Sequence, residues 1–405
     1  MTAALMEAMD LDVPEPTHEL VQVVRGHRSG LAIIVAVHST ALGPAAGGCR
    51  IAHYPTPASA IADAMRLAAA MTEKNALAGL DHGGAKAVVA LPTTTRPTGA
   101  ERTALLHDVG DTIELLGGRY IAGPDVGSAP VDMSVIGERT AHVCCRPVED
   151  GGSGDSSVHT ARGTLAALGA VADEVFGSPE LAGRTVGVVG LGAVGGHVAR
   201  LLSRAGARLV VTDVDPATRR LAKEVGAVWV EPDDALTAEV DILVPAALGG
   251  LLTARTVPLL RCAAVAGPAN NQLDEPATAR LLAARGVLWA PDVVVSAGGV
   301  IHATGVELRG ESEDQLTERL SGIAATLREV FDLARADRTT PAEAATELAR
   351  QRVHRGAPHP AHGAVEPPSS PTALRRQPGP SAYRATSPSN ASNASYATSP
   401  TAQEN

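Results

Sequence analysis

The chain has 405 residues, of which 45% are apolar and 19% are charged, a composition typical of a globular protein. Its length accommodates two or three domains. Only 2% of the residues are aromatic, which argues against a base-stacking surface for single-stranded nucleic acid. The net charge of −10 also leaves no basic footprint for DNA or RNA.

The sequence pattern predicts no membrane span, signal peptide or metal site. No apolar run is long enough to cross a bilayer, and the first 16 residues lack the basic-then-apolar order of a signal peptide. The four cysteines contain no CxxC pair and predict neither a zinc site nor a disulfide framework. We interpret them as small buried apolar residues in a reducing compartment: Cys49, Cys144, Cys145 and Cys262. We therefore expect a cytoplasmic protein with no metal site and no membrane partner.

In the first part of the chain, the pattern predicts a hairpin, two helices and a buried strand. The segments ELVQVV and LAIIVAV flank HRSG, which is typical of a β-hairpin with glycine at the turn. Apolar residues at helical spacing predict helices over 57–71 and 101–116. The run AKAVVALP predicts a buried strand over 85–92.

After the GGSG stretch at 151–154, apolar strands alternate with helices. A long helix is expected over 157–176 and an amphipathic helix over 313–336. This alternation predicts a parallel, doubly wound sheet. Its expected strands are 185–190, 208–213, 241–248, 262–267 and 286–291. The last 50 residues, 356–405, are rich in Ser, Pro, Thr, Asn and Ala, and we expect a disordered tail there.

A glycine-rich motif lies between the first two of these strands. Gly190, Gly192 and Gly195 fit GxGxxG with Ala193 and Val194 between them, and the next strand ends in Asp213. Glycines allow a tight turn and a close approach to a pyrophosphate, which the helix N-terminus attracts. A carboxylate at the second strand accepts hydrogen bonds from a ribose 2′-hydroxyl and repels a 2′-phosphate. The motif therefore predicts NAD binding, and the alternative is a similar turn with no nucleotide.

Two lysines and one aspartate are candidates for chemistry. Lys74 and Lys86 are 12 residues apart, and Lys86 enters an apolar strand. Two ammonium groups in one cleft lower each other's pKa, which suits one for proton transfer and the other for binding a carboxylate. Asp125 lies in a loop bounded by Gly and Pro. The alternatives are a snorkelling or ion-paired lysine and an ordinary turn aspartate.

The motifs around these residues resemble the amino acid dehydrogenases that act on leucine, valine and phenylalanine, which are distantly related to glutamate dehydrogenase. In chain order they read GGCR, MTEKNA, GGAKAV, GPDVGS, GDSSVHTA, GLGAVG, AGPANNQL and PDVVVSAGGVI. The resemblance runs from about residue 20 to about residue 353. It implies reversible oxidative deamination of an apolar L-amino acid to a 2-oxo acid, with NAD as cofactor, in a homo-oligomer.

The resemblance also implies roles for individual residues. Lys86 corresponds to the catalytic lysine, Asp125 to the acid that exchanges protons with the amino group, and Lys74 to the lysine that binds the substrate carboxylate. The other implied substrate-binding residues are Gly47, Gly48, Ala46, Gly123, Asn270, Val300 and Ala303. The implied cofactor-binding residues are Gly190, Gly192, Ala193, Val194, Gly195, Asp213, Thr160, Ala247 and Asn270, with Thr160 holding the nicotinamide carboxamide.

We expect an α/β fold in two domains and a tail. Residues 1–150 and 313–355 are assigned to a substrate-binding and oligomerisation domain, 151–312 to a Rossmann NAD-binding domain, and 356–405 to the tail. The predicted side-chain pocket has small apolar walls, which favour phenylalanine or another bulky residue over valine, with overlapping substrates. No cation is placed to pair with a second carboxylate, which disfavours glutamate.

Three departures from the family pattern leave alternatives open. Ala85 replaces a glycine before the catalytic lysine, Ser296 replaces an asparagine, and Ala246 replaces a cysteine. Ala85 and Ser296 motivate a second hypothesis, an NAD-binding sensor or scaffold without turnover. A third hypothesis is a hydroxy-acid dehydrogenase that uses His82 or His159, although structural roles are the ordinary expectation for both histidines.

Overall fold

The structure is a computed structural model that describes residues 17–94 and 96–356. Apart from Gly356, the tail expected over 356–405 lies outside the described residues. Within the described part, no helix is long and apolar enough to cross a membrane.

The first sheet has five strands in the order β1-β2-β4-β3-β5. Strands β1 and β2 form the expected antiparallel hairpin, and Gly30 at its turn has a φ of 70°. Strand β4 pairs antiparallel with β2 and parallel with β3, which in turn pairs parallel with β5. The sequence pattern does not predict β3 and β5. The strands are β1 (Leu20–Arg25), β2 (Ala32–Ser39), β3 (Ala45–His53), β4 (Gly84–Leu91) and β5 (Tyr120–Pro124).

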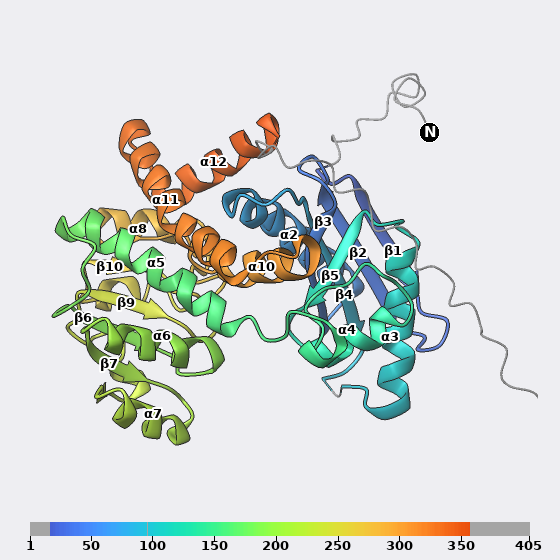
Figure 1. Cartoon of the computed structure of the whole chain (residues 1–405), viewed down its shortest axis with the longest axis horizontal. Helices are drawn as coiled ribbons and strands as arrows, with labels where there is room; N and C mark the ends of the chain where they lie inside the picture. The colour runs from blue at the N-terminus through green and yellow to red at the C-terminus, as the bar shows by residue number, and fades with distance from the viewer. Residues whose placement is uncertain (1–16, 95, 357–405) are drawn as a thin grey trace, which may run out of the picture. The chain divides into compact units, whose positions relative to one another are not determined.

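Helices cover both faces of this sheet (Figure 1). Alternate residues of β4 belong to different layers: Val88 packs in a cluster with α2 (Pro57–Leu77), whereas Ala87 and Val89 pack with α3 (Gly99–Glu114) and α4 (Pro130–Gly137). Because side chains alternate along a strand, Lys86 shares the α2 side with Val88. Helix α2 extends six residues beyond the predicted end at residue 71, so Lys74 lies on it.

The second sheet has six parallel strands in the order β11-β10-β9-β6-β7-β8. This order reverses between β6 and β9, which confirms the predicted doubly wound sheet and creates the switch point where such folds bind ligands. Its strands are β6 (Thr185–Val189), β7 (Arg208–Thr212), β8 (Val228–Trp229), β9 (Ile242–Pro245), β10 (Ala264–Val265) and β11 (Leu288–Trp289). Its helices are α5 (Ser157–Phe176), α6 (Ala193–Arg204), α7 (Arg219–Glu224) and α8 (Thr278–Ala284).

Five further helical segments follow β11. They are α9 (Asp292–Val295), α10 (Gly298–Ala303), the π-helix η5 (Thr304–Leu308), α11 (Glu313–Asp337) and α12 (Pro341–Arg355). Helix α11 packs on α5 of the second sheet, and α12 packs on α2 of the first (Figure 1). The C-terminal helices thus contact both halves of the described chain. The predicted return of 313–355 to the first domain stays a prediction.

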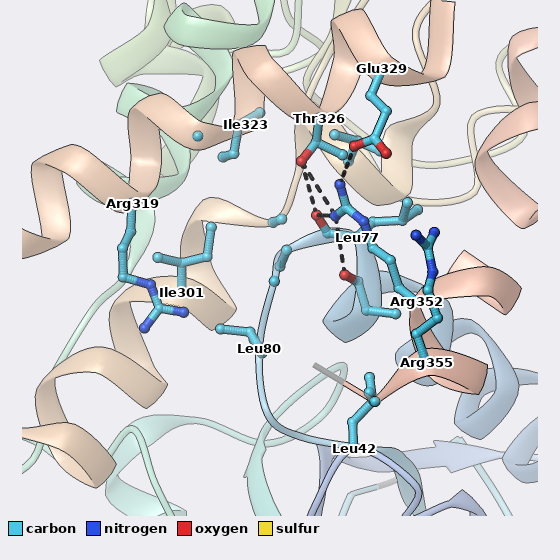
Figure 2. Close-up of a pocket in the computed structure, with 17 residues that line it drawn as sticks. Leu42, Leu77, Leu80, Ile301, Arg319, Ile323, Thr326, Glu329, Arg352 and Arg355 are labelled. Carbon is cyan, nitrogen blue, oxygen red and sulfur yellow. Dashed lines mark hydrogen bonds and ion pairs between the residues drawn. The ribbon is translucent and has the colours of Figure 1, made fainter. Parts of the chain in front are cut away.

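A cavity of about 590 Å³, here called the junction cavity, lies where the end of α2 meets α9, α10, α11 and α12. Figure 2 shows Arg352 of α12 reaching across it. Its guanidinium donates to the carbonyl oxygens of Ala76 at 3.3 Å and Leu77 at 2.8 Å, and to the carboxylate of Glu329 at 2.6 Å. Since the last carbonyls of a helix have no partner within the helix, Arg352 caps α2 from outside.

Candidate functional site

A second, smaller cavity of about 270 Å³, here called the cleft cavity, contains the groups suited to chemistry. Segments of both halves of the chain line it, from β3 and α2 to α9 and α10. All ten substrate-binding or catalytic residues proposed from the sequence are among its walls: Ala46, Gly47, Gly48, Lys74, Lys86, Gly123, Asp125, Asn270, Val300 and Ala303. The lining alone does not assign them roles, but it brings together residues that are more than 250 positions apart.

An ion-pair cluster forms one wall of the cleft cavity. Nζ of Lys86 lies 2.9 Å from Oδ2 of Asp125, directly after β5. Nε of Arg50, on β3, donates to the same oxygen at 2.9 Å, and its NH1 group pairs with Asp63 on α2 at 2.9 Å. Lys86 is only 5% exposed. A buried ammonium of this kind needs a charged partner, and Asp125 provides it.

Lys74 faces the cleft cavity from α2, and Asn270 faces it from the second half of the chain. Nζ of Lys74 donates to Oδ1 of Asn270 at 2.8 Å. Oγ of Ser296 lies 3.2 Å from the same Oδ1 and donates to the carbonyl oxygen of Asp292 at 2.6 Å. Ser296 therefore fills the position of the family's asparagine, and its single hydroxyl proton has two acceptors within reach.

Two glycines of β3 leave room for the ion-pair cluster and for the neighbouring strand β4. A Cβ on Gly48 would lie 3.0 Å from Nζ of Lys86 and 2.7 Å from Cβ of Asp125, so a side chain there collides with the cluster. A Cβ on Gly47 would lie 1.8 Å from the carbonyl oxygen of Ala85. Asn75, fully buried on α2, donates to the carbonyl oxygens of Ala46 and Gly83 and holds β3 beside the start of β4.

The pKa values of Lys74, Lys86 and Asp125 all lie below their ordinary values, for the two lysines because of burial and for Asp125 because of neighbouring charges. Burial lowers the pKa of Lys74 to about 8, with Asp292 opposing the shift and Lys86 adding to it. Burial also lowers the pKa of Lys86 despite the pull of Asp125. Burial raises the pKa of Asp125, but Lys86 and Arg50 outweigh it and hold the value below the ordinary one. The cleft cavity thus combines an ionised carboxylate with amines that release protons readily.

The glycine-rich loop has the shape that a dinucleotide requires. Gly190 has a φ of 103°, a conformation that glycine adopts without strain. A Cβ on Gly195 would lie 2.0 Å from the carbonyl oxygen of Gly190, so this glycine lets α6 approach the loop closely. A Cβ on Gly192 would meet nothing within 4 Å, which leaves open space at the N-terminus of the 12-residue helix α6. The residues present therefore fit a pyrophosphate.

The remaining cofactor candidates lie around this loop or beside α10. Oδ2 of Asp213 accepts a hydrogen bond from the Leu191 amide at 2.6 Å, which ties the end of β7 to the loop. Ala247 packs against Gly190, because a Cβ on that glycine would lie 2.8 Å from the Ala247 Cβ. Thr160, on α5, lies beside Gly299, because a Cβ built on that glycine would lie 3.0 Å from Oγ1 of Thr160. Ala193 and Val194 begin α6.

Sequence reasoning missed several polar and thiol groups of the cleft cavity. Arg50 is the arginine of the quoted GGCR motif, but its pairing with Asp125 depends on a parallel β3–β5 contact that was not predicted. Asp292, Cys144 and Cys145 also line the cavity. Their sequence context gives no signal of this placement. Cys145 and Cys262 are partly exposed, so the expectation that all four cysteines are buried is wrong for these two.

The histidines of the third hypothesis lie elsewhere. Nδ1 of His82 is within 2.9 Å of the carbonyl oxygen of Pro44, and His159 stacks on His302 with ring centroids 3.6 Å apart. Neither His82 nor His159 lines the cleft cavity. Among the described residues, no group of three His, Cys, Asp or Glu side chains is arranged to hold a metal ion.

Comparison with known proteins covers both halves of the chain. Residues 17–142 match the dimerisation domain of Glu/Leu/Phe/Val dehydrogenase, and residues 211–357 match the model described as Glutamate/Leucine/Phenylalanine/Valine dehydrogenase. Residues 157–259 also match the NAD-binding domain of D-isomer specific 2-hydroxyacid dehydrogenase. This third match covers only part of the nucleotide-binding half.

Individual relatives align over most of their length. The chain is 43% identical to a valine dehydrogenase of Streptomyces coelicolor over 85% of this chain and 94% of the relative. It is 39% identical to a leucine dehydrogenase of Geobacillus stearothermophilus over 83% of this chain and 90% of the relative. The crystal structure of L-tryptophan dehydrogenase from Nostoc punctiforme superposes with a TM-score of 0.74 at 33% identity, over 87% of this chain and 99% of that one. The chain belongs to the Glu/Leu/Phe/Val dehydrogenase family.

Proposed function

We propose that the chain catalyses the reversible, NAD-dependent oxidative deamination of an apolar L-amino acid to a 2-oxo acid and ammonia. The observation that carries this proposal is the convergence of Lys74, Lys86 and Asp125 in one cavity whose other wall comes from the nucleotide-binding half. The valine and leucine dehydrogenases among its relatives support the reaction type. An apolar lining around a few charged groups suits an amino acid with an apolar side chain.

Lys74 and Asp125 orient the substrate in this mechanism. Lys74 now donates to Asn270, and a substrate carboxylate replaces that neutral acceptor with a charged one. Asp125 stays ionised because Lys86 and Arg50 pair with it, so it accepts a proton from the substrate ammonium group. The free amine that results is the form that loses hydride from Cα.

Lys86 activates water in the second half of the reaction. A nicotinamide cofactor held at the glycine-rich loop of Gly190, Gly192 and Gly195 would supply the hydride acceptor, and loss of hydride from Cα would leave a substrate iminium. Nζ of Lys86 then polarises a water molecule that attacks this carbon, and its lowered pKa allows it to take up and return the water proton. Asp125, 2.9 Å away, passes a proton to the departing ammonia. The balance is amino acid, NAD⁺ and water to 2-oxo acid anion, ammonium, NADH and one proton.

Asp213 supports the choice of NAD over NADP. Its Oδ1 accepts from the amide of Asp215 at 2.8 Å, and its Oδ2 accepts from Leu191, which fixes the carboxylate at the end of β7. A carboxylate in this position binds ribose hydroxyls and repels a 2′-phosphate. We therefore assign NAD as the working cofactor.

The side chains that line the cleft cavity bear on the size of the substrate side chain. Besides the four apolar residues proposed from the sequence (Ala46, Gly123, Val300 and Ala303), of which three are small, larger side chains line the cleft cavity. They are Leu67 and Met71 of α2, with Cys144 and Cys145. We therefore favour a branched aliphatic side chain over the phenylalanine side chain favoured from the sequence. Because one methylene changes discrimination by only about 1–3 kcal/mol, several apolar amino acids share the site.

The family departures are compatible with catalysis. Ala85 lies in β4 and is not among the described residues with positive φ, so its methyl group requires no strained backbone. Ser296 keeps a contact to Asn270. Neither substitution separates Lys86 from Asp125. These observations favour an enzyme over the non-catalytic sensor.

A substrate panel tests the proposal. The purified full chain is assayed for NADH absorbance at alkaline pH with L-valine, L-leucine, L-phenylalanine, L-glutamate and D-valine, each with NAD and with NADP. We expect turnover of the three apolar L-amino acids with NAD, most efficiently with the aliphatic pair, and stoichiometric ammonia. No turnover of any L-amino acid by protein that still binds NAD contradicts the proposal.

We also propose a homo-oligomer assembled through the first half of the chain. The match of residues 17–142 to a dimerisation-domain model supports it. A single peak at the monomer mass in light scattering during size-exclusion chromatography contradicts it.

A further inference from the structure

Two sulfur atoms meet in the wall of the cleft cavity. Cys144 and Cys145 are neighbours in sequence, and their Sγ atoms lie 3.9 Å apart. Both sulfurs also face the same point, because a Cβ built on Gly123 would lie 3.5 Å from Sγ of Cys144 and 3.7 Å from Sγ of Cys145. Gly123 and both cysteines line the cavity, so the paired thiols border the space expected for the substrate side chain.

The backbone at Cys145 produces this pairing. Successive side chains of an extended chain point to opposite sides, so adjacent thiols ordinarily diverge. Cys145 has a φ of 62°, a left-handed conformation that is uncommon for a residue other than glycine. This turn places both sulfurs on one side. A non-glycine residue in this conformation persists only where its surroundings hold it, and such residues cluster at functional sites.

Glu307 of the π-helix η5 holds the turn. Its Oε1 accepts hydrogen bonds from the Cys145 amide and from the amide and hydroxyl of Ser153, the latter two at 2.8 and 2.6 Å. These three donors fix the loop that carries the cysteines against the segment that follows α10. Residues of α10 and η5, including Ala303 and Thr304, line the same cavity. The dithiol is therefore a fixed part of the cavity wall.

We propose that Cys144 and Cys145 form a dithiol site that binds trivalent arsenicals and thereby occludes the cleft cavity. An arylarsine oxide supplies one arsenic centre with an oxygen as leaving group. Two arsenic–sulfur bonds form, the arsenic–oxygen bond breaks, and the two thiol protons leave with the oxygen as water. Arsenic stays trivalent, so no oxidant or reductant is needed. Two linked thiols gain about 10²-fold or more in avidity over one, which distinguishes this pair from the other cysteines.

Intact-mass spectrometry with phenylarsine oxide tests the site directly. The reduced full chain is mixed with one equivalent of reagent, and we expect one phenylarsenic group per chain with loss of two hydrogens. A dithiol such as 2,3-dimercaptopropanol should remove the group, whereas the same thiol concentration of 2-mercaptoethanol should not. Cys144→Ser and Cys145→Ser should each reduce adduct formation at least tenfold, and Cys262→Ser, outside the cavity, should not change it.

Two outcomes overturn the proposal. One is an adduct that survives in both serine variants or is released by the monothiol, since either shows that one sulfur suffices. The other is wild-type protein that forms no adduct although both thiols react with a small alkylating reagent. The occlusion claim rests on the proposed function and predicts loss of turnover on modification and its return with the dithiol. Absent turnover before treatment counts against the function alone, because the adduct mass is measured independently.

Discussion

The junction cavity and the cleft cavity differ in the partners of the positively charged side chains that line them, and this difference does not follow from their volumes. The junction cavity, at about 590 Å³, is more than twice as large as the cleft cavity, at about 270 Å³. Its cation Arg352 donates to two helix carbonyls and to Glu329, and Arg319 pairs with Glu311 at 2.6 Å. In the cleft cavity, Lys74 has only the neutral Asn270 oxygen as its hydrogen-bond partner among the described residues. Arg355 of the junction cavity also has no anionic partner among the described residues and donates to Gln351, but it is exposed to solvent. A partly buried cation without an anion, as at Lys74, marks a place for an anionic ligand.

The choice of cation sharpens this contrast. The chain has 34 lysines and arginines, and only three of them are lysines: Lys74, Lys86 and Lys223. Two of the three line the cleft cavity, and none lines the junction cavity. Arginine stays protonated in proteins, whereas a buried lysine shifts its pKa into the range where it transfers protons. In the cleft cavity, the chain therefore places arginine where the charge is structural, at Arg50, and lysine at the two positions that the proposed mechanism uses, Lys86 for proton transfer and Lys74 for the substrate carboxylate.

Among the substitutions that test this contrast, Lys86→Ala is expected to have the largest effect, a fall in kcat. Removing Nζ eliminates the group that polarises water, and general acid–base catalysis is typically worth about 10²–10⁴-fold in rate. We expect kcat with L-valine to fall by about this factor while NAD affinity, measured by calorimetry, is retained. Lys223→Ala, an exposed lysine on α7, is the matched control and should leave kcat unchanged.

Turnover near the wild-type level in Lys86→Ala contradicts the catalytic role. A loss of NAD binding in the same variant indicates instead that the fold has changed, and circular dichroism distinguishes this case. Arg50 still pairs with Asp125 in the variant, which keeps that carboxylate ionised.

Substitution of Lys74 is expected to have the next largest effect. Deprotonation of Lys74 also makes the affinity for a carboxylate ligand fall as the pH rises. Its pKa is lowered to about 8, so it is charged below pH 8 and neutral above. Only the charged form attracts a carboxylate. The affinity for isovalerate, an unreactive carboxylate, should therefore be highest below pH 8 and fall up to about tenfold per pH unit above it. In Lys74→Met, binding should be about 10–100-fold weaker and lose this pH dependence.

NMR of the protein with isotopically labelled lysine measures this pKa directly, because only three side-chain signals exist. We expect the Lys74 signal to titrate near pH 8. Asp292→Asn should lower the midpoint further, since the Asp292 carboxylate opposes the effect of burial. A Lys74 midpoint at the ordinary lysine value contradicts the buried placement of this amine.

Most of the fold could be predicted because it depends on local patterns. The hairpin, the α5 helix over 157–176 and the parallel second sheet follow from apolar periodicity and glycine positions. Strand β3 could not be recognised, because its sequence AAGGCRIAH has two glycines and no alternation. Those glycines are explained only by the distant groups that a side chain would hit, the Ala85 carbonyl and the Lys86 ammonium.

The candidate site divides in the same way. Lys74, Lys86 and Asp125 were identified from residue type and motif. Arg50 was not, because its role depends on the parallel pairing of β3 with β5, which no local pattern indicates. The paired thiols could not be predicted either, because their convergence depends on one backbone torsion at Cys145 and on a contact from Glu307, 162 residues away.

The smallest expected effect comes from the junction cavity, where Arg352→Met separates stability from chemistry. The variant loses the donors to the Ala76 and Leu77 carbonyls, and we expect a loss of about 1–3 kcal/mol in the free energy of unfolding measured in urea. Lys74 and Lys86 remain in place, so kcat should change by less than about threefold, well below the loss of a proton-transfer group. Arg350→Met, which removes only an exposed pair with Glu347, should stay within about 0.5 kcal/mol. If Arg352→Met abolishes turnover without loss of stability, the junction cavity takes part in catalysis and the distinction drawn between arginine and lysine fails.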